Sequence, residues 1–255
     1  DVCSSDLVGM LVTEGMRVHA SNPGNVHQMR LYEDAIVPTL APVVDAVHAE
    51  GALFIAQLNH GGRQHHGAHI PNMWGPSAIA CPASGGIPHA MTRAEIANVV
   101  KGFGSAARNA QRAGCDGVEV HGAQGHLIQE FVSAFSNQRD DEYGGSLENR
   151  MRFPLEVVAA VREVWPEDKP LLLRISATDW VEGGWDGDSS VELARRAAAL
   201  GVDLVDVSTA GLHPDQRIDV GPGYQVRFAA QIRRETGVPT SAVGLITEPR
   251  QAEEI

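Results

Sequence analysis

The sequence predicts an α/β fold, namely an incomplete (β/α)8 TIM barrel. Six short apolar runs alternate with longer helical patterns, which is typical of a parallel sheet with right-handed crossovers. The last three runs begin roughly 33 to 36 residues apart, which is the spacing of one barrel unit. A doubly wound sheet would more often open with a glycine-rich phosphate turn, and the sequence contains no GxGxxG.

The elements follow from local patterns. Gly51, Gly201 and Gly237 each stand shortly before an apolar run and can end the preceding helix. Short aliphatic or β-branched runs predict strands over residues 8–12, 52–58, 117–121, 171–175, 204–207 and 240–243. Helical periodicity predicts helices over residues 35–49, 93–112, 147–164, 191–200 and 225–234.

The two ends of the chain differ from the rest. Residues 1–7, DVCSSDL, resemble the translation of a sequencing adapter, so they are excluded from the fold prediction. The other end stops inside a helix that Thr247 and Pro249 begin, with no C-cap. We therefore expect one domain over residues 8–255, a partial barrel without its first and last strands.

Composition excludes several classes of protein. The 255 residues are 43% apolar and carry a net charge of -12, which disfavours nucleic acid and membrane surfaces as partners. The chain has neither a signal peptide pattern nor the roughly 18 consecutive apolar residues of a membrane span, so we expect a cytoplasmic location. Cys3, Cys81 and Cys115 are too few and too scattered for a disulfide framework or a zinc site.

Polar clusters follow the predicted strands, where the chemistry of a barrel lies. One is QLNHGGR at residues 57–63, and another is EVHGAQGH at residues 119–126. Arg174 lies inside the apolar run LLLRIS, and a charge within a strand costs several kcal/mol unless it is paired. We expect Arg174 to face an anion or an electron-rich ligand, and a salt bridge to a neighbouring carboxylate is the alternative.

The motifs resemble one known family. The stretch NQRDDEYGGSLENR at residues 137–150 is the most specific, and QLNHGGR, EVHGAQG, SATDW, GPGYQ and AVGLIT accompany it. Together they are similar to the Old Yellow Enzyme family of FMN-dependent oxidoreductases, and the resemblance extends from about Gly9 to Ile255. The later segments resemble the NADPH dehydrogenase branch, and the earlier ones resemble the 2,4-dienoyl-CoA reductase-like members.

The resemblance implies how FMN is bound. FMN lies across the barrel mouth in this family, so residues 8–255 are expected to form a partial FMN-binding barrel. The resemblance assigns Gln57 to the flavin pyrimidine edge and Arg174 to the neighbourhood of N1 and O2, where a cation stabilises reduced flavin. Gly15 matches the small residue beside the isoalloxazine, and Gly244 heads a phosphate-binding loop.

The resemblance also implies the reaction, in which NAD(P)H reduces the flavin and the flavin reduces the C=C bond of an α,β-unsaturated carbonyl compound. His121 and Gln124 match the pair that donates hydrogen bonds to the substrate carbonyl oxygen, which makes the β-carbon electrophilic. Gln124 has a longer side chain than the usual His or Asn of the family. His126 stands where the family usually has the tyrosine that protonates the α-carbon.

Several alternatives stay open. The chain could be the flavin barrel of a larger iron–sulfur flavoenzyme, of the 2,4-dienoyl-CoA reductase or amine dehydrogenase type, or a redox-silent barrel that binds a phosphate ligand. The expected partner is a small electrophilic alkene such as an enone, and a homo-oligomer is a candidate state. No metal site is expected, because His60, His65, His66 and His69 share one glycine-rich loop without a carboxylate or thiol.

Overall fold

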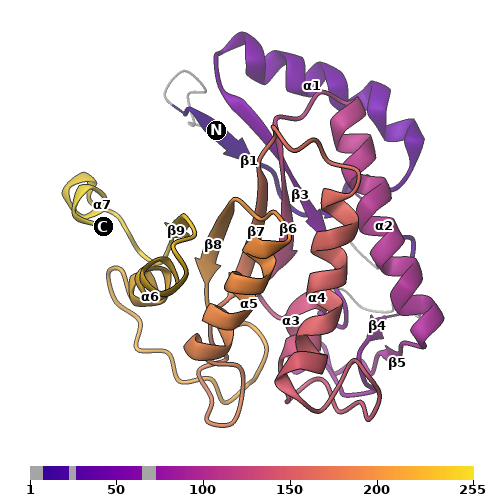
Figure 1. Cartoon of the computed structure of the whole chain (residues 1–255), viewed down its shortest axis with the longest axis vertical. Helices are drawn as coiled ribbons and strands as arrows, with labels where there is room; N and C mark the ends of the chain where they lie inside the picture. Colours follow the sequence, from indigo (N-terminus) through magenta and orange to yellow (C-terminus); the bar gives the residue numbers. More distant parts are fainter. Residues whose placement is uncertain (1–7, 23–26, 65–72) are drawn as a thin grey trace.

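The computed structural model describes residues 8–22, 27–64 and 73–255 (Figure 1). The expected adapter residues 1–7 therefore lie outside the described residues. A curled parallel sheet with the strand order β1-β3-β6-β7-β8-β9 forms the centre, and helices cover its outer side (Figure 1). This arrangement confirms the predicted incomplete barrel.

Each of the six predicted strands is present, with ends that differ from the prediction by at most two residues. The strands are β1 (Met10–Val12), β3 (Leu53–Asn59), β6 (Gly117–Gly122), β7 (Leu171–Ser176), β8 (Leu204–Ser208) and β9 (Thr240–Ala242). Three two-residue strands were not predicted, namely β2 (Met16–Arg17), β4 (Trp74–Gly75) and β5 (His89–Ala90).

The five predicted helices are also present, and side-chain caps explain where several of them begin. Asp186 accepts a hydrogen bond from the backbone of Ser189, so the fourth predicted helix starts at Gly187 rather than at 191. The sequence did not predict a short helix, α3 (Leu127–Val132). The remaining helices of the structure are η2 (Asp34–Ile36), α1 (Val37–Ala49), α2 (Arg93–Arg112), α4 (Leu147–Arg162), α5 (Gly187–Ala199), α6 (Val226–Thr236) and α7 (Pro249–Glu254).

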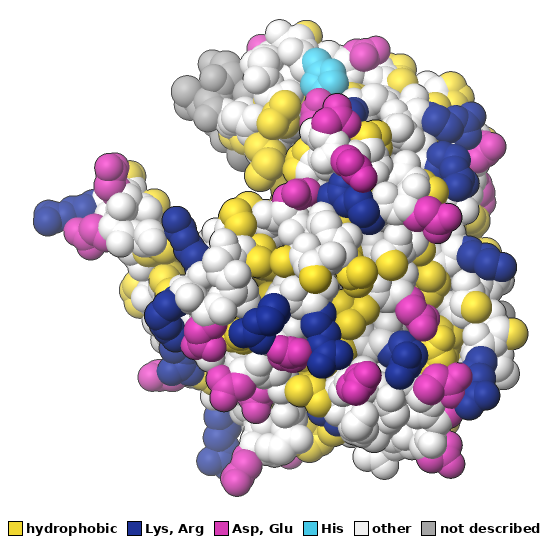
Figure 2. Space-filling model, in the orientation of Figure 1, with side chains coloured by type: hydrophobic (Ala, Val, Ile, Leu, Met, Phe, Trp, Pro, Cys, Tyr) yellow, Lys and Arg dark blue, Asp and Glu magenta, His cyan; other side chains and the backbone are white. Residues whose placement is uncertain are grey.

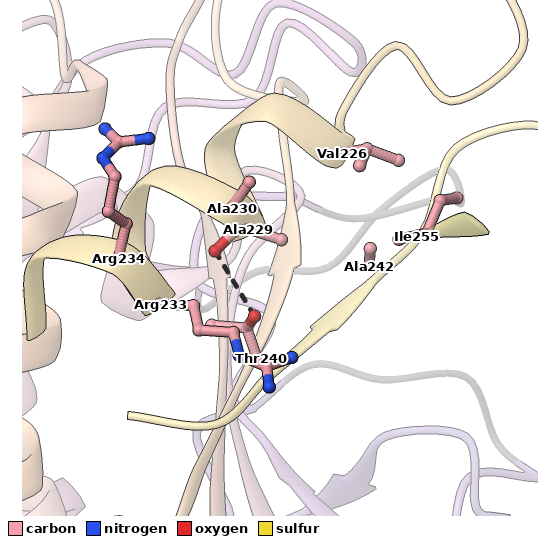
Figure 3. Close-up of a pocket in the computed structure, with 8 residues that line it drawn as sticks. All are labelled: Val226, Ala229, Ala230, Arg233, Arg234, Thr240, Ala242 and Ile255. Atoms are coloured by element: carbon pink, nitrogen blue, oxygen red, sulfur yellow. Dashed lines mark hydrogen bonds between the residues drawn. The ribbon is translucent and has the colours of Figure 1, made fainter. Parts of the chain in front are cut away.

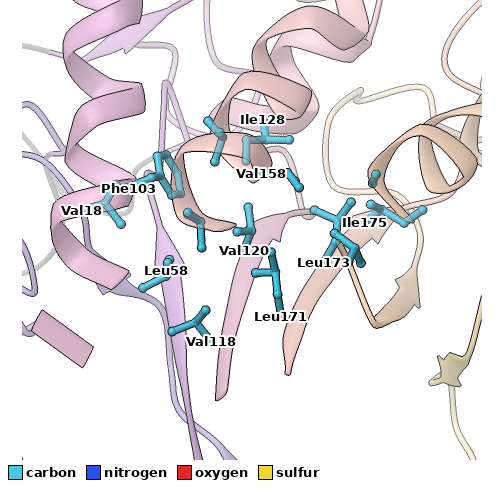
Figure 4. Close-up of a cluster of buried hydrophobic side chains, with 14 of the residues drawn as sticks. Val18, Leu58, Phe103, Val118, Val120, Ile128, Val158, Leu171, Leu173 and Ile175 are labelled. Carbon is cyan, nitrogen blue, oxygen red and sulfur yellow. The ribbon is translucent and has the colours of Figure 1, made fainter. Parts of the chain in front are cut away.

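The hydrophobic core lies between the sheet and the helices. Val120 and Leu173 point from neighbouring strands toward Phe103 of α2, Ile128 of α3 and Val158 of α4 (Figure 4). These side chains are at most 1% exposed. Alternate strand residues therefore supply the apolar contacts, and the residues between them face the opposite side of the sheet.

Within the residues that the structure describes, the sheet is open at both edges. β1 and β9 each have one strand neighbour along the path, and Met10, Leu11 and Leu53 beside one edge are more than a third exposed. Figure 2 shows a deep notch between the region of β1 and the region of α6 and α7. The curled sheet thus does not close into a full barrel.

A cavity of about 620 Å³ lies at the other edge, between α6 and β9 (Figure 3). Ala229 of α6 accepts a hydrogen bond of 3.3 Å from the Thr240 hydroxyl beside it, and Ile255 forms part of the opposite wall (Figure 3). None of the predicted site residues lines this cavity. The candidate active site has to be sought at the carboxyl ends of the strands.

Candidate active site

The inner face of the sheet carries polar residues at the carboxyl ends of four adjacent strands. They alternate with the apolar residues that face the helices, so each strand contributes two of them. All but Arg174 are buried. They are Gln57 and Asn59 on β3, Glu119 and His121 on β6, Arg174 and Ser176 on β7, and Asp206 and Ser208 on β8.

Gln57 and Glu119 are partners across two neighbouring strands. Their Cα atoms are paired in the β3 and β6 register, and the Gln57 Nε2 donates a 2.6 Å hydrogen bond to the Glu119 Oε2. Burial and the charge of Asp206 raise the pKa of Glu119, the bond from Gln57 and the charge of Arg174 lower it, and the net result is a pKa of about 7. The pair therefore holds a titratable carboxyl beside the predicted flavin contact.

Arg174 forms the salt bridge that the sequence left as an alternative. Its Nη1 lies 3.0 Å from the Asp206 Oδ2, and the Ser241 hydroxyl donates a 2.6 Å bond to the other oxygen of Asp206. The Arg174 Nε is buried and has no hydrogen-bond partner among the described residues. The guanidinium therefore retains a donor beyond its ion pair, so the salt bridge and a ligand contact can coexist.

His121 and His126 lie together at the carboxyl end of β6. Their ring centroids are 4.7 Å apart, and the rings meet edge to face. Burial lowers the pKa of His121 well below its usual value, and charge on His126 and Arg174 acts in the same direction. The Nδ1 of His121 is buried without a hydrogen-bond partner in the described part of the chain. His121 is thus a neutral imidazole at neutral pH.

Gln124 is held by two serines from adjacent strands. Its backbone N–H donates a 3.0 Å bond to the Ser176 hydroxyl, and its Nε2 donates a 2.9 Å bond to the Ser208 hydroxyl. Its φ of +52° lies in the left-handed region that few residues other than glycine adopt. The side chain is therefore turned toward β8, and one N–H of its amide is already used.

The His126 ring is anchored by β3. Its Nδ1 lies 2.9 Å from the Asn59 Oδ1, which can only accept, so this nitrogen carries the proton. Gly15 packs against the same asparagine, because a Cβ at position 15 would lie 2.7 Å from the Asn59 Cβ. The small size of residue 15 thus has a structural reason within the protein itself.

Gly244 lies away from this cluster, in the loop that follows β9. Its φ of +114° is accessible to glycine and strained for other residues, and its carbonyl accepts a 2.7 Å bond from the backbone of Gly223. A Cβ there would also lie 3.0 Å from the Gln225 side chain. The loop geometry therefore requires glycine at this position.

The histidine-rich loop can be described only in part. His60 is buried, and its two ring nitrogens bond to the Ser21 hydroxyl at 3.0 Å and to the backbone N–H of Gly62 at 3.1 Å. Burial lowers its pKa to about 3. His65, His66 and His69 lie outside the described residues. His60 thus serves the packing of the loop.

The structure brings together five of the seven predicted site residues. Gln57, His121, Gln124, His126 and Arg174 belong to the inner-face cluster or border it, whereas Gly15 touches it through Asn59 and Gly244 stands in a separate loop. Sequence reasoning assigned no role to five residues of the cluster, namely Asn59, Glu119, Ser176, Asp206 and Ser208. Strand alternation could have found them, because each stands two residues from another polar residue of the same strand or is a charge inside an apolar run.

No helix within residues 8–22, 27–64 and 73–255 combines the length and hydropathy that a bilayer span requires.

Comparison with known proteins places the chain among flavin oxidoreductases. Residues 3–255 match the NADH:flavin oxidoreductase / NADH oxidase family. An NADPH dehydrogenase of Geobacillus thermodenitrificans (strain NG80-2) is 45% identical over 97% of this chain, which spans 72% of that protein.

Solved structures give the same assignment. A 2-naphthoyl-CoA reductase in complex with 2-naphthoyl-CoA superposes with a TM-score of 0.90 at 31% identity, over 98% of this chain and 41% of that one. Morphinone reductase in complex with tetrahydroNAD gives a TM-score of 0.81 at 28% identity, over 98% of this chain and 72% of that one. The relatives imply FMN with NAD(P)H as the reductant. The chain therefore belongs to the NADH:flavin oxidoreductase / NADH oxidase family of FMN-dependent oxidoreductases, to which the Old Yellow Enzymes belong.

Proposed function

We propose that this oxidoreductase reduces the C=C bond of α,β-unsaturated carbonyl compounds and takes the hydride from NAD(P)H. The observation that carries the proposal is the state of His121. It is a buried, uncharged imidazole with an unused ring nitrogen among the described residues, and it lies beside a cation at the strand ends. A neutral donor in a water-poor site is suited to stabilise negative charge that develops on a carbonyl oxygen.

The residues present fit FMN. The Gln57 carboxamide offers an acceptor and a second N–H, and Arg174 offers a buried Nε without a partner in the described chain. We assign these two residues to the flavin ring, Gly15 to the space beside it, and Gly244 to the phosphate loop. When bound, FMN supplies a hydride acceptor and donor at its N5. Arg174 would hold the added negative charge of the reduced ring.

His121 and Gln124 would bind the substrate carbonyl oxygen. One N–H of the Gln124 amide is bonded to Ser208, and an amide nitrogen carries two hydrogens, so the second N–H can still be donated. Ser208 thereby fixes the direction of the longer glutamine side chain. Two donors at one oxygen draw electron density from the β-carbon, which then accepts a hydride.

His126 would deliver the proton to the α-carbon. Because its Nδ1 bonds to Asn59, its Nε2 is the nitrogen that gains and releases the catalytic proton. Water is the alternative proton source, with His126 then serving only to line the pocket.

A second candidate function follows from the similarity to 2-naphthoyl-CoA reductase, of which this chain spans 41%. In that case the chain is the flavin barrel of a larger enzyme, and the substrate is an aryl- or enoyl-CoA thioester. Both candidates use the same carbonyl-binding pair. Rates with 2-cyclohexenone and with an enoyl-CoA at equal concentration separate them.

The proposal is tested by separating the two half-reactions in an anaerobic stopped-flow instrument. His121→Ala should slow reoxidation of the flavin by 2-cyclohexenone about 10²- to 10³-fold, the usual loss for one oxyanion donor. Reduction by NADPH should be slowed less, because no carbonyl oxyanion develops in that step. Equal slowing of both half-reactions would remove His121 from the substrate-binding role.

A further inference from the structure

A buried carboxylate lies directly beside the predicted flavin contact, and the proposed reaction does not use it. Glu119 is 1% exposed and Gln57 is 8% exposed, and the two occupy paired positions on β6 and β3. The 2.6 Å bond from the Gln57 Nε2 to the Glu119 Oε2 joins them within the inner face.

This bond decides which way the Gln57 carboxamide is turned. The oxygen and nitrogen of a carboxamide exchange places when the group flips by half a turn, and a neighbour that only accepts hydrogen bonds selects one of the two states. An ionised carboxylate is such a neighbour. With Nε2 bonded to Glu119, the Oε1 and the second N–H of Gln57 are directed elsewhere.

The selected state matches the pyrimidine edge of a flavin. That edge presents one N–H donor, at N3, between two carbonyl oxygens. A carboxamide that offers Oε1 and one N–H pairs with the N3 hydrogen and an adjacent carbonyl. The flipped state would leave Oε1 facing the Glu119 carboxylate, which is repulsive.

Burying a carboxylate at this position costs free energy of desolvation, which a contact between two neutral side chains would not. Burial and Asp206 of β8 raise the pKa of Glu119, and the bond from Gln57 and the cation of Arg174 on β7 offset only part of that effect. A neutral glutamine could accept the same bond without the desolvation penalty. Strongly shifted carboxyl groups inside a cleft are typical of functional positions.

We propose that Glu119 is a positioning residue that fixes the Gln57 carboxamide in the orientation required to bind the flavin pyrimidine edge. The inference rests on the proposed binding of FMN by Gln57. Glu119 acts through Gln57 and does not itself touch the flavin, so its effect has to disappear when the amide is removed.

A double-mutant cycle on FMN affinity tests this dependence. The dissociation constant of the apo-protein for FMN is measured at pH 8 from the quenching of flavin fluorescence, for the parent, Glu119→Leu, Gln57→Leu and the double variant. We expect each single substitution to weaken binding about tenfold, and the double variant to bind as Gln57→Leu does. Multiplicative losses in the double variant would overturn the proposal, since they would mean that Glu119 acts independently of Gln57.

Two conservative variants guard against a failure of Glu119→Leu to fold. Glu119→Asp keeps the charge and withdraws it from Gln57, so it should weaken FMN binding severalfold. Glu119→Gln keeps an acceptor at the same distance but can also donate an N–H, so it selects the orientation less strictly and should lose no more than about threefold in affinity. Thermal melts verify that each variant is folded. Equal affinities of the folded Glu119→Asp protein and the parent would contradict the proposal.

A modified flavin separates positioning from general packing. 3-Methyl-FMN has no hydrogen at N3 and cannot use the Gln57 Oε1, so its affinity should be equal for the parent and for Glu119→Asp. An equal loss for FMN and 3-methyl-FMN would show that residue 119 affects only the shape of the site. If the parent binds FMN and no Glu119 variant changes the affinity, the positioning role of Glu119 is wrong and the proposed function stands. If the parent binds no FMN, both the positioning role and the proposed function are wrong.

Discussion

The two faces of the central sheet are made from the same strands and differ in almost every property. Toward the helices, residues such as Val120 and Leu173 form a dry apolar core. Toward the other side, the intervening residues Glu119, His121 and Arg174 form a polar row. The pKa values of Glu119 and His121 are shifted, and buried nitrogens of His121 and Arg174 have no hydrogen-bond partner among the described residues. The apolar face stabilises the fold, and this stability offsets the cost of burying the polar and charged side chains of the inner face.

The largest effect is expected from a charge on the apolar face. Leu173→Asp places a carboxylate among side chains that offer no hydrogen bond, so it should lower the free energy of unfolding by more than about 4 kcal/mol. Leu173→Met, which preserves volume, should cost less than about 1.5 kcal/mol. Urea unfolding followed by circular dichroism measures both. A well-folded Leu173→Asp protein would mean that this face is not the core.

The next effect concerns pH and the carboxyl on the polar face. The pKa of Glu119 rises from 4.5 to about 7 on folding, so the folded state binds its proton more tightly, and stability is lost as the pH rises through that interval. A pKa that rises from 4.5 to about 7 corresponds to about 3 kcal/mol. Glu119→Gln should therefore gain about 3 kcal/mol relative to the parent between pH 5 and pH 8.

Comparing the two proteins at each pH removes the contributions of other groups. Burial raises the pKa of Glu130 to about 8 and lowers the pKa of His60 to about 3. As the pH rises, Glu130 therefore lowers the stability of the parent and His60 raises it, so the parent alone would report the sum of opposing effects. If the stability difference between parent and variant does not change with pH, Glu119 is not the titrating group.

A smaller effect is expected at His126. If its imidazolium supplies the α-proton and that transfer limits the rate, the enone half-reaction should slow about tenfold per pH unit above the pKa of the ring. His126→Tyr should flatten the profile, because a phenol with a pKa near 10 stays protonated throughout the neutral range. A profile that is flat from pH 6 to 9 in the parent, with His126→Ala equally fast, would assign the proton to water.

The smallest effect is expected at a helix cap on the outer side. Thr92 accepts a hydrogen bond from the backbone of Glu95 and forms a capping box with it, so Thr92→Ala should lower stability by about 1 kcal/mol. Thr92→Ser keeps the hydroxyl and serves as the control. FMN affinity should be unchanged in both variants. A change in affinity without a change in stability would show that the two faces are not separate in function.

Much of this division could be predicted from the sequence. The alternation of strands with helices predicted the sheet and its order, and the position of Arg174 inside LLLRIS predicted an inward charge. The start of α5 was placed four residues late, because the side-chain cap of Asp186 outweighs the apolar periodicity that begins at Val191.

The contacts between strands could not be read from the sequence. The partner of Gln57 depends on the register that sets it beside Glu119, and the partner of Arg174 depends on the register that sets it beside Asp206. Likewise, the motif alone discloses neither the positive φ of Gln124 nor the hydrogen bond from its amide to Ser208. Register and backbone angles are properties of the folded chain.

Flavin binding by the inner face can be tested at two adjacent residues that point to opposite faces of the sheet. FMN affinity and unfolding free energy are measured for Arg174→Gln, which removes the cation beside Asp206, and for Leu173→Ala. We expect Arg174→Gln to weaken FMN binding at least about tenfold and to lower stability, because it leaves the Asp206 carboxylate without its cation, and we expect Leu173→Ala to cost about 3 kcal/mol of stability with the affinity unchanged. A folded Arg174→Gln protein that binds FMN as tightly as the parent would contradict flavin binding by the inner face.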